Sequence, residues 1–518
     1  MKNKFVLLFL ANCLSWYLSV CQDKRGHNVI YGGGGVIARF DGTSNKPITG
    51  QLFPTPASTS DYVYVAGAHS CISDSAQGNL LFFCNSAILY DTLGHIMENG
   101  DSLQPGKIYE HNCCPSQGFG ITQGSLIIPK GSDHQYYVFT PTITDSMYTY
   151  WNSNPFGDGR FPYNLLQYHV VDIYANSGMG KVVKKNVKIL ENVELCKTGM
   201  MACKHANGYD WWLLKQGANT NNIYTFFVTK DTVILDTIQT FPEPVFGYYD
   251  LRGQSCFNSD GSKYAFASGG GYLNNNGARL FIADFDRCHG ILSNVKEIKV
   301  PYDSTLTILD TIWQAYDSLI TGISFSPNDS FLYVSRRYNI YQNNLYETDS
   351  LLAWYHVKQG PDTTFLQFAQ YGQLQLGVDG RIYIGKIGGT GNSNSVIDKP
   401  NIKGAGCDFC RKCLRMDTTQ WYTQSFANMP NFNMPKKEPC WPLHNQQVNG
   451  EHHTWDFYPN PAQQQIVINH AQNKLKILYN MVGQAVVSTT NDIIELRALQ
   501  RGVYYLFCEG VVKKVIIE

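Results

Sequence analysis

One hairpin pattern recurs along the chain and constrains its fold more than any other feature. Each copy has the end of an apolar strand, a short polar turn and a second strand of alternating residues. The copies occupy residues 256–268, 324–335 and, more loosely, 376–385. Their turns contain Asp260-Gly261, Asn328-Asp329 and Asp379-Gly380. Gly and Asn tolerate the positive φ that tight hairpin turns require. Recurrence at intervals of roughly 50 to 70 residues indicates one sheet unit used repeatedly.

Such repetition is typical of a β-propeller, in which four-stranded sheets called blades stand around an axis. Residues 29–440, at roughly 60 residues per blade, give about seven blades, with six as the alternative. An array of β-sandwiches is the competing architecture, but sandwiches seldom repeat one hairpin in this way. The aromatic content of 13% and the 46 glycines favour strands and turns, and long helical periodicity is absent. The predicted class is therefore all-β.

The first residues have the pattern of an export signal. Lys2 and Lys4 precede an apolar run from Phe5 to about Val20 that is short and interrupted by polar residues. Residues 1–21 are predicted to be a cleaved signal peptide. Residues 18–21 loosely resemble a lipoprotein box, which would make Cys21 a lipid attachment site, but a small residue is preferred where Val20 stands. No second stretch approaches the roughly 20 apolar residues of a membrane-spanning helix, so no transmembrane segment is expected.

The charge balance excludes two classes of partner. The chain has 41 Lys and Arg against 41 Asp and Glu, and its formal net charge is zero. Binding to nucleic acid or to an anionic membrane surface needs a basic excess or a basic run. We therefore expect neither nucleic acid nor an anionic membrane surface as a partner.

The cysteines suggest an oxidising compartment. Of the 15 cysteines, Cys13 and Cys21 lie in or beside the signal and Cys508 lies near the C-terminus. The other twelve form an even set, which fits disulfide pairing in an exported protein. They are Cys71, Cys84, Cys113, Cys114, Cys196, Cys203, Cys256, Cys288, Cys407, Cys410, Cys413 and Cys440.

A metal site is the alternative for four of these cysteines. Cys407, Cys410 and Cys413 are spaced by two residues each, and with Cys440 they could bind zinc through four thiolates. Their spacing fits no standard zinc or iron–sulfur pattern, so disulfides are favoured and no metal or other cofactor is predicted.

The last part of the chain is predicted to be a separate small domain. Residues 441–456 are polar and indicate a linker. Residues 457–518 contain five short alternating segments, which predict a small Ig-like β-sandwich. The segments are residues 465–469, 475–479, 485–487, 503–507 and 511–517.

This C-terminal segment resembles the type A sorting domain of the type IX secretion system of Bacteroidota. The opening motif is Tyr458, Pro459, Asn460 and Pro461. The later motifs are residues 478–484, which include Gly483, residues 499–505, which include Gly502 and Tyr504, and residues 513–517, which include Lys514. Asn480 stands where the family commonly has Asp. The resemblance implies that the secretion machinery recognises this domain and passes the chain across the outer membrane. The domain is then usually cut off, and the body is released or attached to surface lipopolysaccharide.

The body resembles a group of secreted Bacteroidota β-propellers related to the WD40/YVTN-like and quinoprotein-amine-dehydrogenase-like propellers. The residues that carry this resemblance are 72–82, 123–129, 136–140, 204–208 with Trp211 and Trp212, and 397–402 with the following Cys407. The group has no established activity to transfer. The resemblance therefore implies a fold and a location outside the cell or on its surface, and it implies no chemistry.

No catalytic motif is present. The sequence has no phosphate-binding loop, dinucleotide fingerprint, Gly-x-Ser-x-Gly or His-Glu-x-x-His. Lys204, His205, Trp211 and Trp212 are the candidate ligand-contacting residues, with packing inside the blade as the alternative. The favoured function is non-catalytic binding of a protein or glycan partner. The alternative is an extracellular polymer-acting hydrolase or lyase whose site lies in the propeller channel.

Overall fold

The computed structural model describes residues 23–31, 36–40, 47–51, 68–111, 121–131, 134–153, 162–218, 220–241, 253–268, 278–301, 319–336, 339–348, 353–358, 370–387, 393–415, 426–437, 440, 455–480, 485–508 and 511–518. The signal segment, most of the predicted linker, Cys113, Cys114 and Gly483 lie outside these residues. The chain divides into two compact units, Met1–Cys440 and Trp441–Glu518.

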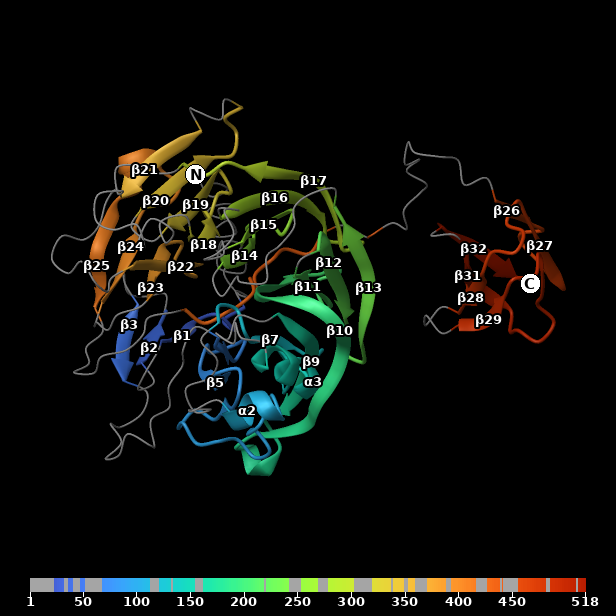
Figure 1. The fold of residues 1–518 in the computed structure, drawn as a ribbon, viewed down its shortest axis with the longest axis horizontal. Helices are drawn as coiled ribbons and strands as arrows, with labels where there is room; N and C mark the ends of the chain where they lie inside the picture. The colour runs from blue at the N-terminus through green and yellow to red at the C-terminus, as the bar shows by residue number, and fades with distance from the viewer. Residues whose placement is uncertain are drawn as a thin grey trace, which may run out of the picture. The chain divides into compact units, whose positions relative to one another are not determined.

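The first unit is a β-propeller, whose antiparallel sheets stand around one centre (Figure 1). Blade 1 contains β1 (Asn28–Tyr31), β2 (Val36–Arg39) and β3 (Ile48–Gln51). Blade 2 contains β4 (Ser70–Ser73), β5 (Leu80–Cys84) and β6 (Leu89–Tyr90). Blades 3 and 4 share one sheet of β7 (Leu126–Pro129), β8 (Gln135–Thr142), β9 (Tyr163–Asp172), β10 (Lys181–Lys204), β11 (Trp211–Gly217), β12 (Asn222–Val228) and β13 (Val233–Thr240).

The last three blades are four-stranded and follow the chain order. Blade 5 is β14 (Gly253–Phe257), β15 (Lys263–Ser268), β16 (Arg279–Asp286) and β17 (Ile291–Ile298). Blade 6 is β18 (Ile320–Phe325), β19 (Phe331–Arg336), β20 (Ile340–Asn344) and β21 (Trp354–Lys358). Blade 7 is β22 (Gln370–Leu376), β23 (Ile382–Ile387), β24 (Ser393–Ile397) and β25 (Phe409–Arg415). The described strands thus make seven blades when the shared sheet counts as two.

Strand β10 belongs to two blades. Its first part pairs with β9, its last residues pair with β11, and Leu195 pairs with both neighbours. The first part carries Lys and Glu side chains and is partly exposed, whereas the residues from Leu195 to Cys203 are buried throughout. A polar edge strand of blade 3 therefore continues, without a loop, as the buried innermost strand of blade 4.

The hairpin that recurs in the sequence is the turn between the first two strands of a blade. The three copies are the turns β14–β15, β18–β19 and β22–β23. Gly261, Asp329 and Gly380 have φ values of 73°, 58° and 79°, as tight turns of this kind require. The turns after β4 and β10 contain Gly78 and Gly208, also at positive φ. The prediction of an all-β propeller from this repeat is confirmed.

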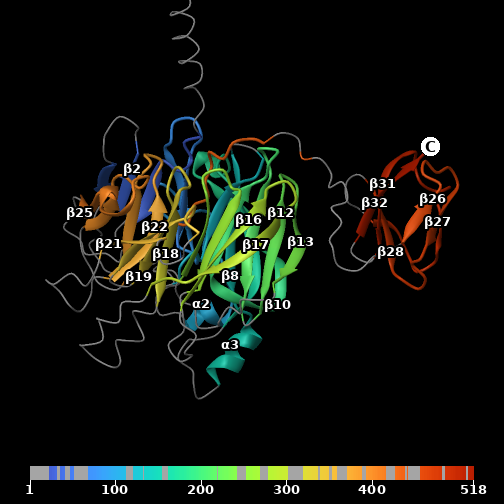
Figure 2. The same cartoon turned by 90° about the horizontal axis from the view of Figure 1, so that it is seen from above.

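Two short helices lie on the opposite face of the ring from these turns (Figure 2). They are α2 (Lys107–His111) and α3 (Asp145–Asn152). Two 3₁₀ turns, η3 (Asn176–Gly178) and η5 (Gly404–Cys407), complete the described elements of this unit.

Residues 426–437, here called the strap, follow the last blade and cross the centre of the ring (Figures 1 and 2). The strap belongs to no sheet, yet Phe426, Asn428, Phe432 and Met434 are buried. The backbone N–H of Asn428 donates to the carbonyl of His69 at 2.8 Å. Near its other end, the N–H of Lys437 donates to the carbonyl of Ala206 at 3.1 Å.

Three buried carboxamides, here called the amide hub, join the inner strands at the axis: Gln123, Gln254 and Asn428. Asn428 Nδ2 donates to the carbonyls of Ser125 and Met200, both at 3.0 Å. Its Oδ1 accepts from Gln123 Nε2 at 3.1 Å. Asn428 therefore joins blades 3 and 4 directly.

The other two carboxamides of the amide hub reach the inner strands of blades 5, 6 and 7. Gln123 Nε2 donates to the carbonyl of Ser255 at 2.9 Å, and its Oε1 accepts from the N–H of Ser255 at 2.9 Å. Gln254 Nε2 donates to the carbonyl of Leu374 at 2.7 Å, and its Oε1 accepts from the N–H of Ile323 at 3.1 Å. These bonds link blades 3, 5, 6 and 7.

The second unit is a small β-sandwich. One sheet contains β26 (Asp456–Tyr458), β27 (Gln465–Asn469) and β30 (Ile493–Glu495). The other contains β29 (Ala485–Thr489), β28 (Lys476–Tyr479), β31 (Gly502–Cys508) and β32 (Val511–Ile517). Trp455, which the sequence placed in the linker, is buried in the core of this sandwich. The predicted small β-sandwich is confirmed.

The amide hub generates a first prediction. Replacing Asn428 by Leu keeps much of the side-chain volume but takes the Asn428 donor from two buried carbonyls and the Asn428 acceptor from one N–H of Gln123. Each unsatisfied buried group costs about 1–3 kcal/mol. We expect the midpoint of thermal unfolding of the propeller, measured by calorimetry, to fall by several degrees. Asn431→Ala removes two exposed hydrogen bonds from the same strap and is the matched control. An equal fall in both variants would contradict a special role of the amide hub.

A second prediction concerns acid stability. His69 Nε2 contacts the carbonyl of Ile30 at 2.7 Å, and Nδ1 has no hydrogen-bond partner among the described residues. Burial lowers the pKa of His69 from 6.5 to about 4. Between these two values the unfolded chain binds a proton that the folded chain does not, so stability is lost as the pH falls.

We expect the melting temperature to fall between pH 6.5 and pH 4, and the fall to be smaller in His69→Gln, which keeps a donor but does not titrate. His169, whose pKa burial lowers to about 3, adds to the loss in both proteins. His95→Gln, at an exposed side chain, is the control. Parallel pH profiles of His69→Gln and the parent would refute the assignment.

Candidate functional site

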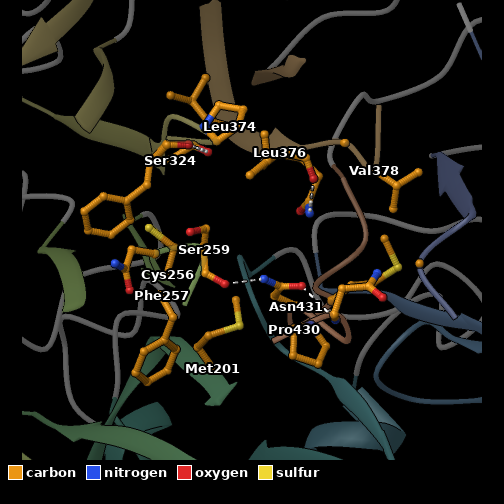
Figure 3. A pocket seen from close by; sticks show the side chains of 18 of the residues that line it. Met201, Cys256, Phe257, Ser259, Ser324, Leu374, Leu376, Val378, Pro430 and Asn431 are labelled. Carbon is orange, nitrogen blue, oxygen red and sulfur yellow. Dashed lines mark hydrogen bonds between the residues drawn. The ribbon is translucent and has the colours of Figure 1, made fainter. Parts of the chain in front are cut away.

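A cavity of about 290 Å³ opens beside the strap, at the face where the recurring hairpin turns lie (Figure 3). Its walls come from the ends of β14, β18 and β22, from the turns that follow them, and from the strap. The residues labelled around it in Figure 3 are Met201, Cys256, Phe257, Ser259, Ser324, Leu374, Leu376, Val378, Pro430 and Asn431. The three hairpin copies of the sequence therefore converge on one site.

The lining of this cavity is uncharged. Apolar side chains make its interior, including Met201, Phe257, Leu374 and Met429. No Asp, Glu, His, Lys or Arg occurs among the described residues that line it. Its one titratable group is the thiol of Cys256, whose pKa is raised by burial to about 12, so the thiol stays protonated at neutral pH.

Amide and hydroxyl groups surround the opening. Asn431 Nδ2 donates to the carbonyl of Ser259 at 3.0 Å, which joins the strap to the β14–β15 turn. Asn433 exchanges two hydrogen bonds with the backbone of Asp23, at 2.8 and 3.1 Å. The Asn431 and Asn433 side chains are exposed and can also meet a ligand from solvent.

Neighbouring turns around the cavity are tied to each other. The Asp329 carboxylate accepts hydrogen bonds from the N–H of Ser259 at 2.9 Å and from its hydroxyl at 2.5 Å. It also accepts from Asn258 Nδ2 at 3.1 Å. Blades 5 and 6 therefore present a pre-formed edge to a ligand.

The candidate residues Lys204 and His205 lie beside the strap. Lys204 Nζ donates to the carbonyl of Phe432 at 2.7 Å and lies 5.4 Å from the ring centre of Trp211. Burial lowers the pKa of this ammonium. His205 accepts from the N–H of Asn207 through Nδ1 and contacts the carbonyl of Cys288 through Nε2 at 3.0 Å.

The two candidate tryptophans are buried in the same region. Trp211 packs edge-on against Phe432 of the strap, with ring centres 5.8 Å apart. Trp212 Nε1 donates to the carbonyl of Arg287 at 2.8 Å. None of the four candidates lines the described cavity. Ligand contact by these residues stays a prediction, and their visible contacts hold the strap and a turn of blade 5.

The four cysteines considered for zinc do not come together. The structure joins Cys410 to Cys413 and Cys440 to Cys288, while Cys407 is buried and unpaired. Within the described part of the chain, no three His, Cys, Asp or Glu residues are grouped so that they could hold a metal ion.

The expectation that the twelve body cysteines all pair is wrong for six of them. Among the described residues, no disulfide joins Cys71, Cys84, Cys196, Cys203, Cys256 or Cys407. They lie on or beside blade strands and are mostly buried, so they pack as small apolar side chains. Burial raises the pKa of Cys71, Cys84 and Cys203 to about 12.

The motif residues of the sandwich are tied together by the backbone of β32. Asn460 Nδ2 donates to the carbonyl of Lys514 at 2.9 Å, and its Oδ1 accepts from the N–H of Ile516 at 2.8 Å. The Tyr504 hydroxyl donates to the carbonyl of Gln500 at 2.8 Å. Tyr458 and Lys514 are exposed, and Gly502 begins β31. The opening and closing motifs of the segment are thus neighbours in space.

The strap is the part of the candidate site that sequence reasoning missed. It contains Asn428, Asn431 and Asn433 between apolar residues, with neither strand alternation nor helical spacing. Buried amides in an irregular segment need partners from elsewhere in the fold. The asparagines between apolar residues are the local feature that could have indicated this segment, but they do not predict which residues they bond to.

Residues 456–518 match the family described as "Secretion system C-terminal sorting domain". This tail is a sorting domain of the type IX secretion system, and it directs the chain to the cell surface or the extracellular space. Among the described residues, no helix has the length and apolar character to cross a membrane. A comparison with curated proteins found no match.

Solved structures resemble the chain only at a distance. A proposed 6-phosphogluconolactonase from Bacteroides uniformis has 11% identity and a TM-score of 0.37, and covers 77% of this chain and 100% of its own. The periplasmic gluconolactonase PpgL of Pseudomonas aeruginosa has 10% identity and a TM-score of 0.35, covering 95% and 99%. The β-propeller domain of Cps50 (Swd1) from Myceliophteria thermophila has 12% identity and a TM-score of 0.27, covering 68% and 94%. At these scores the likenesses carry no argument about activity.

The thiol states generate a third prediction. We expect iodoacetamide at about pH 8 to leave Cys71, Cys84 and Cys203 unmodified in the folded protein, because a thiol with a pKa of about 12 is protonated and buried. Unfolding without a reductant should make these three reactive, whereas Cys288 and Cys440 should also need reduction. Peptide mapping by mass spectrometry distinguishes the two groups. If Cys71 reacted only after reduction, the assignment of free thiols would fail.

Proposed function

We propose that this propeller, which its sorting domain sends out of the cell, is a non-catalytic binding protein. Its ligand is an uncharged part of a glycan or protein partner, held in the cavity between the strap and blades 5 to 7. We further propose that residues 1–21 are removed as a signal peptide and that the disulfides form in an oxidising compartment.

The uncharged lining of the cavity carries this proposal. An apolar interior suits the carbon face of a sugar ring or an apolar side chain, and the exposed Asn431 and Asn433 amides suit hydroxyl or peptide groups. A charged ligand would lose its hydration there without meeting an opposite charge among the described lining residues. The site therefore favours neutral chemistry.

The alternative function, hydrolysis or elimination on an extracellular polymer, needs different groups. Glycoside hydrolysis commonly uses two carboxyl groups, and general acid–base catalysis needs groups that titrate near the working pH. The described lining has a thiol whose pKa is raised to about 12 and no carboxylate or imidazole. This supports binding over catalysis at this cavity.

A fourth prediction tests the proposed function. Val378 lines the cavity, so Val378→Trp should fill it and weaken capture of the protein on an array of neutral and acidic oligosaccharides and peptides by about tenfold or more. Val183→Trp places the same change on an exposed residue of β10 and is the matched control.

The same array tests the charge of the ligand. Capture by a neutral ligand should change little between about 50 and about 500 mM NaCl, because salt screens only charge interactions. Capture restricted to acidic oligosaccharides and lost at high salt would contradict the proposal. Equal capture by Val378→Trp and the parent would also contradict it.

A further inference from the structure

The strap is held mainly by side chains. Among the described residues, its backbone makes hydrogen bonds to blade backbone at Asn428 and at Lys437, near its two ends. Between them, Lys204 Nζ holds the carbonyl of Phe432, and Arg287 Nη1 donates to the carbonyl of Pro435 at 2.9 Å. A segment with few backbone partners opens more easily than a strand within a sheet.

The Arg287 guanidinium is a buried junction between the strap and two turns. Its Nε donates to the carbonyl of Lys204 at 2.8 Å, and Nη1 also donates to the carbonyl of Asp260 at 2.9 Å. Arg287 belongs to the β16–β17 turn, and the next residue is Cys288. The turn that carries Cys288 is therefore fixed independently of its disulfide.

The C-terminal end of the strap is fastened to this turn by a covalent bond. Cys440, three residues beyond Lys437, is joined to Cys288, which lies 152 residues earlier in the chain. Cys288 is held further by its N–H, which donates to Asp286 Oδ1 at 2.8 Å, and by the contact between its carbonyl and His205. The disulfide therefore joins a turn that other contacts hold in place to a segment that has few backbone hydrogen bonds of its own, and it restrains that segment.

The strap also forms one wall of the cavity. Its residues from Met429 to Asn433 all line the site. Loss of the strap would open the cavity to solvent and uncover Trp211, which Phe432 covers. The state of the strap therefore decides whether the cavity exists.

We propose that the Cys288–Cys440 disulfide is a latch that keeps the strap seated once the sorting domain has been removed. In the uncut chain the strap continues into residues 441–518. After a cut between residue 440 and Trp455, it becomes a terminal segment, and terminal segments fray unless they are tied down. The disulfide ties the chain between the strap and its new end. The role of the cavity in ligand binding rests on the proposed function, whereas the latch does not.

The test uses the full chain with a specific protease site placed inside residues 442–453. The double variant Cys288→Ser/Cys440→Ser removes the latch, and Cys410→Ser/Cys413→Ser removes the other disulfide of the described residues as the matched control. Hydrogen exchange at residues 426–437, read by mass spectrometry, reports on the strap before and after the cut.

We expect exchange in the latch variant to rise about tenfold or more after the cut, with a smaller change before it and none in the control. Mild reduction of the folded, cut parent should give the same rise, so the result does not depend on how well the variant folds. Unchanged exchange in the cut latch variant, or an equal rise in the control, would overturn the latch.

Binding of the neutral dye Nile red separates the latch from the proposed function. If the strap loosens and dye binding falls to the level of Val378→Trp, the result supports both the latch and the cavity as the binding site. If the strap loosens and dye binding is unchanged, the latch stands and the cavity is not the binding site.

Discussion

The amide hub at the axis is the constraint on which the propeller depends. Inner strands of a propeller approach each other closely, and their backbone groups must find partners without water. Gln123, Gln254 and Asn428 provide these partners, and His69 extends the network to blade 1 through Ile30. Because Asn428 comes from the strap, the residues that follow the last blade are part of what holds the ring together.

This dependence explains how the ring closes. Each described blade is built from one continuous stretch of chain, so no strand from one terminus completes a blade at the other. Blades 1 and 7 instead meet through side chains, such as Phe40 against Tyr383 at 5.5 Å between ring centres. The Thr49 hydroxyl adds a hydrogen bond to the carbonyl of Arg415. The strap replaces the strand exchange that could otherwise join the two ends.

The sequence predicts the elements whose chemistry is local. A turn with Asp260-Gly261 needs a positive φ at one residue, and that requirement is visible without any tertiary structure. The motif around Asn460 is similarly short, although its pairing with β32 is a contact across more than fifty residues. By contrast, Asn428 and Gln123 are 305 residues apart, and the sequence around either residue does not predict their hydrogen bond.

The candidate site shows the same division. Lys204, His205 and the two tryptophans stand out locally because polar and aromatic groups are adjacent, but their partners are strap and turn carbonyls from distant parts of the chain. The cavity arises where three similar hairpins meet, and each hairpin alone has the apolar strand ends and polar turn residues of an ordinary hairpin. Its neutral character is a property of the assembled ring, so a search for catalytic motifs could not find it.

Strand β10 limits how the chain length between blades 3 and 4 can change. Elsewhere a connecting segment separates the edge strand of one blade from the inner strand of the next, and such segments accept insertions readily. Between blades 3 and 4 the connection is the strand itself, with Leu195 paired on both sides. The strand has register irregularities on both sides of Leu195, so an inserted residue there would have to be taken up by a further bulge or would shift the pairing of the segment that follows. A change of length at this junction therefore has to be accommodated inside a paired strand, and a circular permutation should not be opened there.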